Sequence, residues 1–289
     1  MSVVNRALEE DSLFDEADAI RDNDIYLSNM SKSFADKAWF VKYIRPDITT
    51  IVDFGGGSGE FCQYVDRILS FRKRPMRYVV IDNNQEFAVK AEMNGFMTFS
   101  SLGDFRASRV CDPAQALLVM SSVIHEVYSY QEENGPAEDF WKEVGGCKFR
   151  QIAIRDMSMN EKAYRTVPKS AVAWIYENVF MSDLPIKGVP LRQQTESFEA
   201  RWGAICDPST GRVNVKNLVH FLIKYRYVEN WDREVNEDYL PVTQDRLAGI
   251  IIGMGYQLTH KESSKLEFYA RQWAKDFRLN RPDDNGYRA

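Results

Sequence analysis

The sequence lacks the cysteine spacings and long apolar runs that mark several classes of protein. No C-x-x-C pair occurs among its four cysteines, which are Cys62, Cys111, Cys147 and Cys206. This argues against a zinc cluster and against a disulfide framework, and we expect reduced thiols and no metal site. No run approaches the roughly 18 apolar residues of a membrane span. The N-terminal stretch also lacks the layout of a signal peptide. We therefore expect a cytoplasmic protein without a membrane partner.

Basic residues are not in excess either. The 289 residues include 37 Lys and Arg against 42 Asp and Glu, a net charge of −5. A protein that coats nucleic acid non-specifically is expected to be basic, so the composition does not favour that class. The hydrophobic content of 44% is enough for a sizeable core. The length predicts one large domain, or one domain with an elaboration.

Short apolar segments alternate with helical patterns over the first half of the chain. Strands are expected at 48–54, 77–82, 96–100, 116–122 and 149–157. Helices are expected at 33–44, 60–69 and 85–95, where apolar residues recur at helical spacing. This alternation predicts an α/β fold with a doubly wound parallel sheet.

The regular alternation stops after the fifth strand. The stretch 159–243 is too long for an ordinary connection, so we expect an inserted helical cap with helices at 170–180 and 214–226. A helix at 244–255 then returns to the core, and strands at 256–262 and 265–274 close the sheet as an antiparallel pair. The predicted division is an N-terminal helical segment at 1–45, a core at 46–158 and 244–278, the cap at 159–243 and a loose tail at 279–289.

The most informative segment is IVDFGGGSGEF, residues 51–61, in which a buried strand runs into a glycine loop and a helix follows. Glycines allow a tight turn and the close approach of a ligand. The dinucleotide fingerprint G-x-G-x-x-G, aligned from Gly55, would place the carboxylate of Glu60 beside a pyrophosphate, which is the wrong charge. No Gly-Lys-Ser/Thr follows, so the loop is not a P-loop.

The loop instead resembles motif I, D-x-G-x-G-x-G, of the Rossmann-like (class I) S-adenosylmethionine (SAM) methyltransferases, with matches at Asp53, Gly55, Gly57 and Gly59. The resemblance covers about 35–157 and 244–275 and implies SAM as cofactor. In this family a carboxylate after the second strand holds the ribose, which corresponds to Asp82. The implied cofactor-binding residues are Asp53, Phe54, Gly55, Gly57, Gly59, Asp82, Asn83, Asp104, Phe105, Ser121 and Ser122. Of these, Asp104 and Phe105 correspond to the adenine contacts, and Ser121 and Ser122 follow the fourth strand.

The loop after the fourth strand, SSVIHEVYSY, supplies the candidate catalytic residues His125 and Glu126. An imidazole with an ordinary pKa of about 6.5 suits a general base, and Glu126 could orient it or bind a substrate ammonium. Arg155 and Asp156 end the fifth strand and point to the same edge of the sheet. The sequence has no (D/N/S)-P-P-(Y/F) loop and no Pro-Cys pair, which disfavours adenine-amine, cytosine-amine and cytosine-C5 methyltransferases.

Three functions follow from these features. The first is a methyltransferase acting on an N or O atom of a small or medium-sized acceptor enclosed by the cap. The second is an RNA methyltransferase that docks its substrate through the cap, where arginines alternate with aromatics over 224–234. The third is a catalytically silent partner subunit with the same fold. The oligomeric state is left open.

Overall fold

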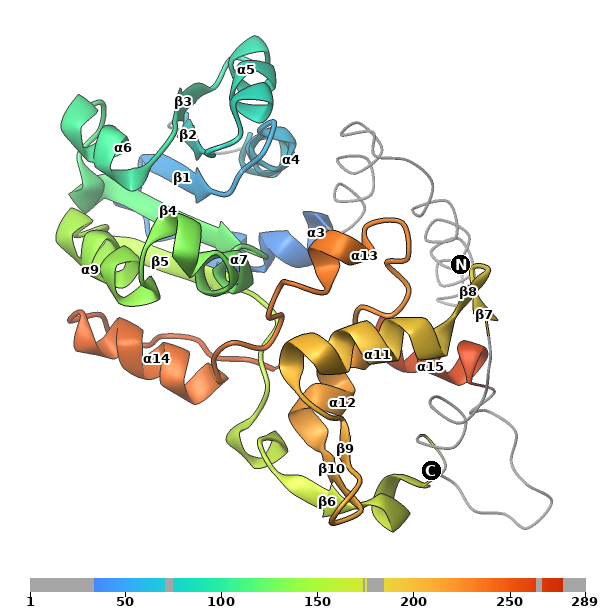
Figure 1. The fold of residues 1–289 in the computed structure, drawn as a ribbon. Coiled ribbons are helices and arrows are strands. Elements are labelled where there is room, and N and C mark those ends of the chain that lie inside the picture. Colours follow the sequence, from blue (N-terminus) through green and yellow to red (C-terminus); the bar gives the residue numbers. More distant parts are fainter. Residues whose placement is uncertain (1–33, 71–74, 174, 176–184, 264–266, 278–289) are drawn as a thin grey trace, which may run out of the picture. The chain divides into compact units, whose positions relative to one another are not determined.

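The computed structural model describes residues 34–70, 75–173, 175, 185–263 and 267–277 (Figure 1). They fall into two compact units, one ending at Met157 and the other beginning at Ser158. Most of the predicted N-terminal segment and all of the predicted tail lie outside the described residues.

The first unit is built on a five-stranded sheet in the order β3-β2-β1-β4-β5. Its strands are β1 (Thr50–Phe54), β2 (Arg77–Ile81), β3 (Met97–Phe99), β4 (Ala116–Ser121) and β5 (Gln151–Arg155). All neighbouring pairs are parallel. β1 and β4 are apolar and buried along almost their whole length, as expected for a sheet covered on both faces. The α/β class and the doubly wound, Rossmann-like sheet are confirmed.

Helices cover this sheet and connect its strands (Figure 1). They are α3 (Phe34–Lys37), η1 (Ala38–Tyr43), α4 (Glu60–Leu69), α5 (Gln85–Met93), α6 (Leu102–Ser108), η2 (Pro113–Gln115), α7 (Ile124–Ser129), α8 (Gln131–Asn134) and α9 (Ala137–Cys147). One core cluster joins α3, η1 and α4 to Ile51 of β1. Side chains alternate along a strand, so Asp53 emerges on the same face as Ile51. The residue pattern of β1 thus directs a carboxylate toward α3 and α4.

The second unit combines helices with two small antiparallel sheets. Its helices are η3 (Glu161–Ala163), η4 (Lys169–Val172), α11 (Leu191–Trp202), α12 (Val215–Leu222), α13 (Trp231–Glu234), α14 (Gln244–Gly253) and α15 (Glu267–Asp276). The sheets are β6-β10-β9 and β7-β8, made of β6 (Thr166–Pro168), β7 (Pro185–Ile186), β8 (Val189–Pro190), β9 (Cys206–Asp207) and β10 (Arg212–Asn214). The prediction of a purely helical cap missed these strands. None of the helices in the described ranges could span a membrane.

The predicted antiparallel pair at 256–262 and 265–274 is not formed. The first segment has no regular secondary structure, and α15 occupies most of the second. The spacing of the aromatic residues explains the helix: Tyr269 and Trp273, four residues apart, have ring centroids 6.1 Å apart. The contacts also group 244–277 with the second unit, and β5 is the last strand of the large sheet.

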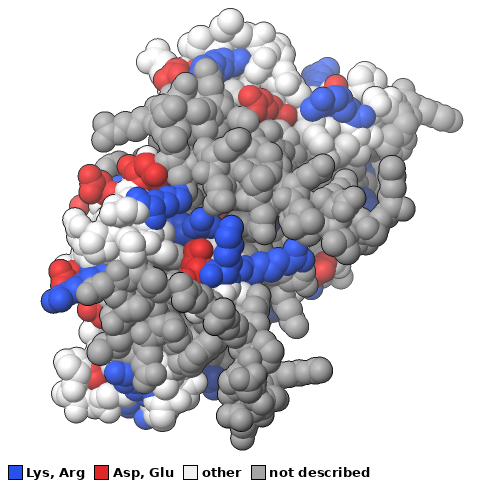
Figure 2. Space-filling view, turned by 90° about the vertical axis from the view of Figure 1, so that its right-hand side faces the viewer, with Lys and Arg blue, Asp and Glu red and all other residues white. Residues whose placement is uncertain are grey.

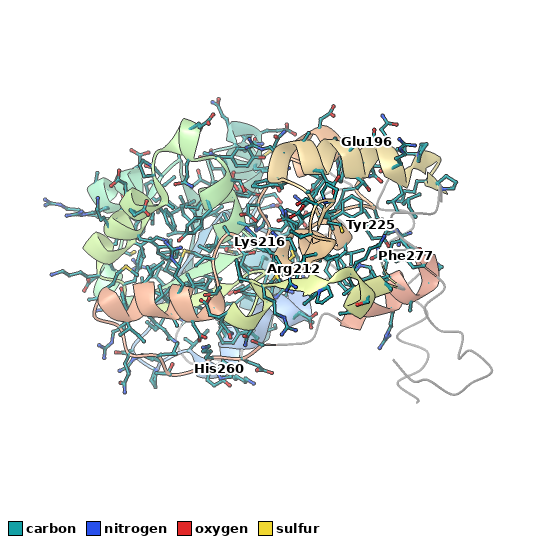
Figure 3. The ribbon with its side chains drawn as sticks, turned by 60° about the horizontal axis from the view of Figure 1, so that its bottom comes forward. Glu196, Arg212, Lys216, Tyr225, His260 and Phe277 are labelled. Atoms are coloured by element: carbon teal, nitrogen blue, oxygen red, sulfur yellow. The ribbon has the colours of Figure 1, made fainter. Side chains whose placement is uncertain are left out.

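Part of the aromatic and basic stretch 224–234 is core, whereas Tyr227 and Arg233 remain exposed. Lys224 and Tyr225 are both 0% exposed. Tyr225 and Phe277 point toward one another (Figure 3), with ring centroids 5.2 Å apart. Tyr225, which the sequence suggested for stacking on bases, therefore packs in the apolar core.

Both signs of charge occur on the face drawn in Figure 2.

Candidate functional site

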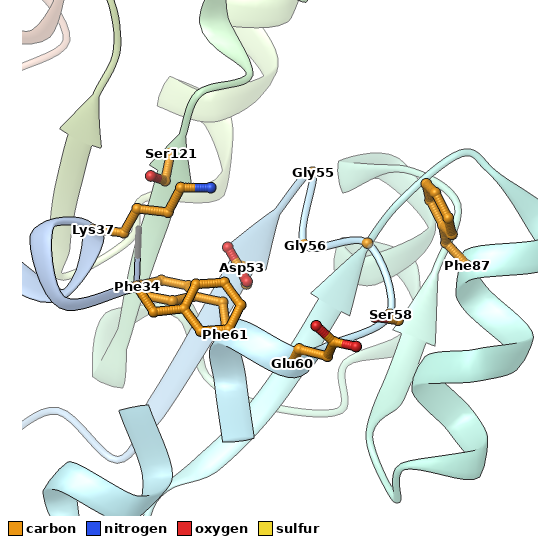
Figure 4. A pocket seen from close by; sticks show the side chains of 11 residues that line it. Phe34, Lys37, Asp53, Gly55, Gly56, Ser58, Glu60, Phe61, Phe87 and Ser121 are labelled. Carbon is orange, nitrogen blue, oxygen red and sulfur yellow. The ribbon is translucent and has the colours of Figure 1, made fainter. Parts of the chain in front are cut away.

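A pocket opens at the carboxyl end of β1, which lies between β2 on one side and β4 on the other, where the strand order of the sheet reverses. This is the place at which open α/β sheets bind ligands. The pocket is lined by Phe34, Lys37, Asp53, Gly55, Gly56, Gly57, Ser58, Glu60, Phe61, Phe87 and Ser121 (Figure 4). Four of the predicted cofactor residues, Asp53, Gly55, Gly57 and Ser121, are thus joined by Lys37 and by aromatic rings from three helices.

The glycine loop between β1 and α4 takes a backbone conformation that side chains resist. Gly55, Gly57 and Gly59 have φ values of +71°, +54° and +78°. Gly59 also lies close to Phe96: a Cβ at Gly59 would lie 2.5 Å from Cδ2 of that ring. The spacing of glycines in the motif therefore follows from the turn itself as well as from any ligand.

Asp53 and Lys37 form the charged part of the pocket. Asp53 is 3% exposed and Lys37 is 6% exposed. Burial raises the pKa of Asp53 to about 7, while the Lys37 ammonium and a hydrogen bond from the Cys62 thiol act in the opposite direction. Burial lowers the pKa of Lys37 to about 8, reinforced by the Arg155 charge and opposed by the Asp53 charge. Two opposite charges are therefore kept out of water beside a cavity.

Asp82 follows β2 and fastens the glycine loop. Its Oδ2 accepts a hydrogen bond from the amide of Gly57 at 2.9 Å, and its Oδ1 accepts one from the amide of Asn84 at 2.9 Å. Burial raises the pKa of Asp82, against these two hydrogen bonds. Asn83 is exposed and lies outside the pocket lining.

Two serine hydroxyls of the pocket have no partner in the structure. The Oγ atoms of Ser58 and Ser121 are buried and make no hydrogen bond, although buried hydroxyls normally find one. Ser122 has a φ of +58°, and its amide donates to the carbonyl of Arg155 at 2.7 Å. A residue other than glycine in this left-handed conformation often marks a functional site.

Seven of the predicted cofactor residues are not part of the pocket lining: Phe54, Gly59, Asp82, Asn83, Asp104, Phe105 and Ser122. The carboxylate of Asp104 accepts hydrogen bonds from the Ser100 and Ser101 hydroxyls at 2.5 and 2.8 Å, which lowers its pKa. It belongs to the N-terminal cap of α6. Phe105 is buried and stacks on Phe149 at 5.8 Å. These local roles account for both residues without a ligand.

Phe54, another of these residues, ends β1 just before the glycine loop. Its ring packs against Phe140 of α9, with centroids 5.1 Å apart. The side chain therefore supports the sheet's other face, and only the backbone of Phe54 leads into the loop.

His125 lies at the start of α7, 6% exposed, with its ring held by Asp156. Nδ1 of His125 is 2.9 Å from Oδ1 of Asp156. Oδ2 of Asp156 accepts hydrogen bonds from the amides of Ile124 at 2.6 Å and His125 at 3.2 Å. The carboxylate that contacts this ring thus belongs to Asp156, the residue directly after β5. Glu126, predicted to orient the ring, follows His125 in α7.

Neither His125 nor Glu126 is part of the pocket lining. Nowhere in the described ranges do three or more His, Cys, Asp or Glu side chains gather so that they could hold a metal ion. The His125–Asp156 pair can accept a proton. The aspartate keeps the ring's own proton on Nδ1, so the lone pair of the neutral ring is on Nε2.

Lys37 was missed at the level of sequence, although a signal was present. It lies three residues after Phe34 and three before Phe40, both of which are buried in the core. A lysine at this spacing occupies the apolar stripe of the helical segment. A charged residue in such a stripe needs compensating charges nearby, and the charges of Asp53 and Asp156 raise the pKa of Lys37 against the effect of burial.

The comparisons with known proteins give only distant likenesses. A crystal structure of a SAM-dependent methyltransferase from Archaeoglobus fulgidus aligns with a TM-score of 0.39 and 12% identity, covering 87% of each chain. The plantazolicin methyltransferase BamL, in complex with a triazolic desmethylPZN analog and SAH, aligns with a TM-score of 0.37 and 10% identity, over 96% of this chain and 86% of that chain. No family model and no curated protein matches the sequence. Likenesses at these TM-scores say nothing about the reaction of this chain.

Proposed function

We propose that the first unit binds SAM in this pocket and that the protein is a SAM-dependent methyltransferase. The observation that carries the proposal is the composition of the pocket. A glycine loop borders a buried carboxylate and a buried ammonium, with the Asp82 carboxylate bonded to the loop from the next strand. A ligand that carries an amino-acid group at one end and a ribose at the other matches this set.

The residues present fit that ligand. A Cβ at Gly56 would lie 2.8 Å from Oδ2 of Asp53, so glycine keeps the carboxylate accessible. Asp53 and Glu60 suit an ammonium and a sulfonium, whereas a pyrophosphate would be repelled. Asp82 uses two of its roughly four lone-pair positions on amides, which leaves two for ribose hydroxyls. The unpartnered hydroxyls of Ser58 and Ser121 provide further hydrogen bonds.

SAM supplies an activated methyl group, so the protein must align an acceptor and remove its proton. We assign the removal of the acceptor's proton to His125, with Asp156 holding the ring. We assign acceptor recognition to 159–243, because every residue of the cofactor pocket lies outside that range. The acceptor is an N or O atom of a small or medium-sized molecule. The burial of Lys224 and Tyr225 withdraws two of the side chains that suggested RNA, whereas Tyr227 and Arg233 remain exposed.

Incubation of the protein with methyl-labelled SAM and a fractionated cell extract tests this function. We expect the label in the small-molecule fraction. His125→Gln serves as the matched control, since it keeps a polar side chain but cannot act as a base. Label in RNA or protein would refute the proposed class of acceptor. The absence of transfer to any fraction would refute the proposal that the protein is a methyltransferase.

A further inference from the structure

The guanidinium of Arg155 is half-buried and has no carboxylate partner in the part of the chain that the structure describes. Its one hydrogen bond there is long: Nη1 donates to Oγ of Ser122 at 3.3 Å. An arginine carries five N–H donors and stays charged, and a charge withdrawn from water is normally paired. Most of the donors of Arg155 are therefore available to an anion from outside the chain.

The neighbouring carboxylate of Asp156 does not supply that anion. Its Oδ1 contacts Nδ1 of His125 at 2.9 Å and accepts a hydrogen bond from the amide of Met157 at 2.7 Å. Its Oδ2 accepts from the amides of Ile124 and His125 at 2.6 and 3.2 Å. These contacts use the roughly four acceptor positions of a carboxylate. Asp156 is thus committed to α7 and not to Arg155.

The strand register directs the side chain of Arg155 to the face of the sheet on which the pocket lies. Arg155 on β5 is the register partner of Ser121 on β4, and residues opposite one another on neighbouring strands share a face. Ser121 lines the pocket (Figure 4). Burial and then the Arg155 charge lower the pKa of Lys37, so the guanidinium is within electrostatic reach of the pocket. Arg155 is not part of the pocket lining itself.

This inference rests on the proposed function and concerns the acceptor. We propose that the methyl acceptor carries a carboxylate or phosphate group and that Arg155 binds this group. A guanidinium matches two oxygens of either anion with two parallel hydrogen bonds. The contact adds one residue of the first unit to the acceptor recognition proposed for 159–243. The cofactor's carboxylate has the same chemistry, but Arg155 lies outside the pocket lining, next to the residue that holds His125.

The charge of the acceptor is tested with methyl-labelled SAM and the small molecules of a cell extract. These are separated before the reaction, by ion exchange at neutral pH, into anionic, neutral and cationic pools, so the result does not depend on the charge of the product. We expect the anionic pool to be the main source of labelled product. A main source in the neutral or cationic pool would overturn the proposal while leaving the methyltransferase intact. No label from any pool would refute the proposed function itself.

Arg155→Gln tests the contact. It removes the charge, and the backbone carbonyl of residue 155 can still accept from the amide of Ser122, as it does at 2.7 Å. With dilutions of the anionic pool as substrate, we expect the apparent KM to rise at least about tenfold, because charge-assisted hydrogen bonds are lost. The affinity for S-adenosylhomocysteine should not change. Arg77→Gln, at an exposed position at the start of β2, is the matched control and should keep the wild-type KM.

Arg155→Lys keeps the charge but loses the paired N–H groups. We expect an apparent KM between those of wild type and Arg155→Gln, and this variant provides the test if Arg155→Gln does not fold. A wild-type KM in the variants would show that Arg155 does not bind the acceptor. Weaker binding of S-adenosylhomocysteine, with unchanged binding of 5′-methylthioadenosine, which lacks the amino-acid end, would assign Arg155 to the cofactor's carboxylate and overturn the proposal.

Discussion

Asp156 holds the imidazole of His125 and the first turn of α7 with one carboxylate. Oδ1 contacts the ring nitrogen Nδ1, and Oδ2 accepts from the amides of Ile124 and His125. A carboxylate can only accept hydrogen bonds, so the proton of the neutral ring lies on Nδ1. The residue is thus a positioning residue, which acts through His125.

Asp156→Asn tests this role. The new amide can keep the backbone hydrogen bonds through its oxygen but presents an N–H group to Nδ1, so we expect the ring proton to move to Nε2. With only three histidines in the chain, ¹⁵N NMR of labelled imidazoles resolves the change. Turnover should fall by about 10²–10⁴-fold, the range of general-base assistance, with little change in SAM affinity. Asp139→Asn, at an exposed position of α9, is the control; an unchanged His125 tautomer in Asp156→Asn would contradict the assignment.

Asp82 has a double role, because it fastens the glycine loop and is the residue proposed for the ribose. Asp82→Ala removes charge-assisted hydrogen bonds worth about 1.5–3 kcal/mol each. The affinity for S-adenosylhomocysteine should therefore fall by at least about tenfold, as measured by calorimetry. Asp36→Ala, an exposed aspartate of the same unit, should leave the affinity unchanged. Equal affinities for wild type and Asp82→Ala would show that the ribose lies elsewhere.

The junction of β1, glycine loop and α4 depends on close packing as well as on backbone conformation. Gly59 and Gly95 both have positive φ, +78° and +86°, but only Gly59 has a neighbour, Phe96, in the place of a Cβ. Either change to alanine costs about 1–2 kcal/mol for the left-handed backbone. Gly59→Ala should cost more than Gly95→Ala in the free energy of unfolding, measured with urea. Equal costs would mean that Phe96 moves aside without penalty.

The elements that sequence reasoning predicted well are those with one dominant signal. The strands β1 and β4 are buried and mostly apolar, and the glycine loop follows directly from β1. The segment of α15 was wrongly predicted to be a closing strand, although its aromatic residues follow the helical period. The hairpin of β9 and β10 was missed, although the turn residues between Asp207 and Gly211 indicate one.

The candidate site was only partly predictable for a related reason. The motif residues on strands and loops follow one another along the chain. The partners Lys37 and Asp156 reach the site from α3 and from the end of β5, and their contacts depend on tertiary packing. Asp104 and Phe105 show the converse, since a capping role and a core role produce the same local pattern as a ligand contact.

The two units should respond differently to acid, because the second unit buries a histidine. His220 is fully buried between Phe198 and Trp202, and burial together with the Lys224 charge lowers its pKa to about 3. As the pH falls below about 6.5, the unfolded chain binds a proton that the folded unit does not. The free energy of unfolding should then decrease by up to about 1.4 kcal/mol per pH unit, down to about pH 3.

Hydrogen exchange at several pH values locates this effect in the second unit. His220→Gln should reduce the acid sensitivity there, whereas His260→Gln should not, since His260 is partly exposed. Glu234, whose pKa burial raises, has the opposite pH dependence, and it is present in both variants. Identical acid profiles for wild type and His220→Gln would contradict this explanation.

Direct binding of S-adenosylhomocysteine to the full chain, measured by isothermal titration calorimetry, tests the central claim most directly. NAD is titrated in parallel, because the competing use of a glycine loop on this sheet is a dinucleotide. We predict saturable binding of S-adenosylhomocysteine at one site and no heat from NAD. Binding of NAD without binding of S-adenosylhomocysteine would contradict the assignment of the pocket.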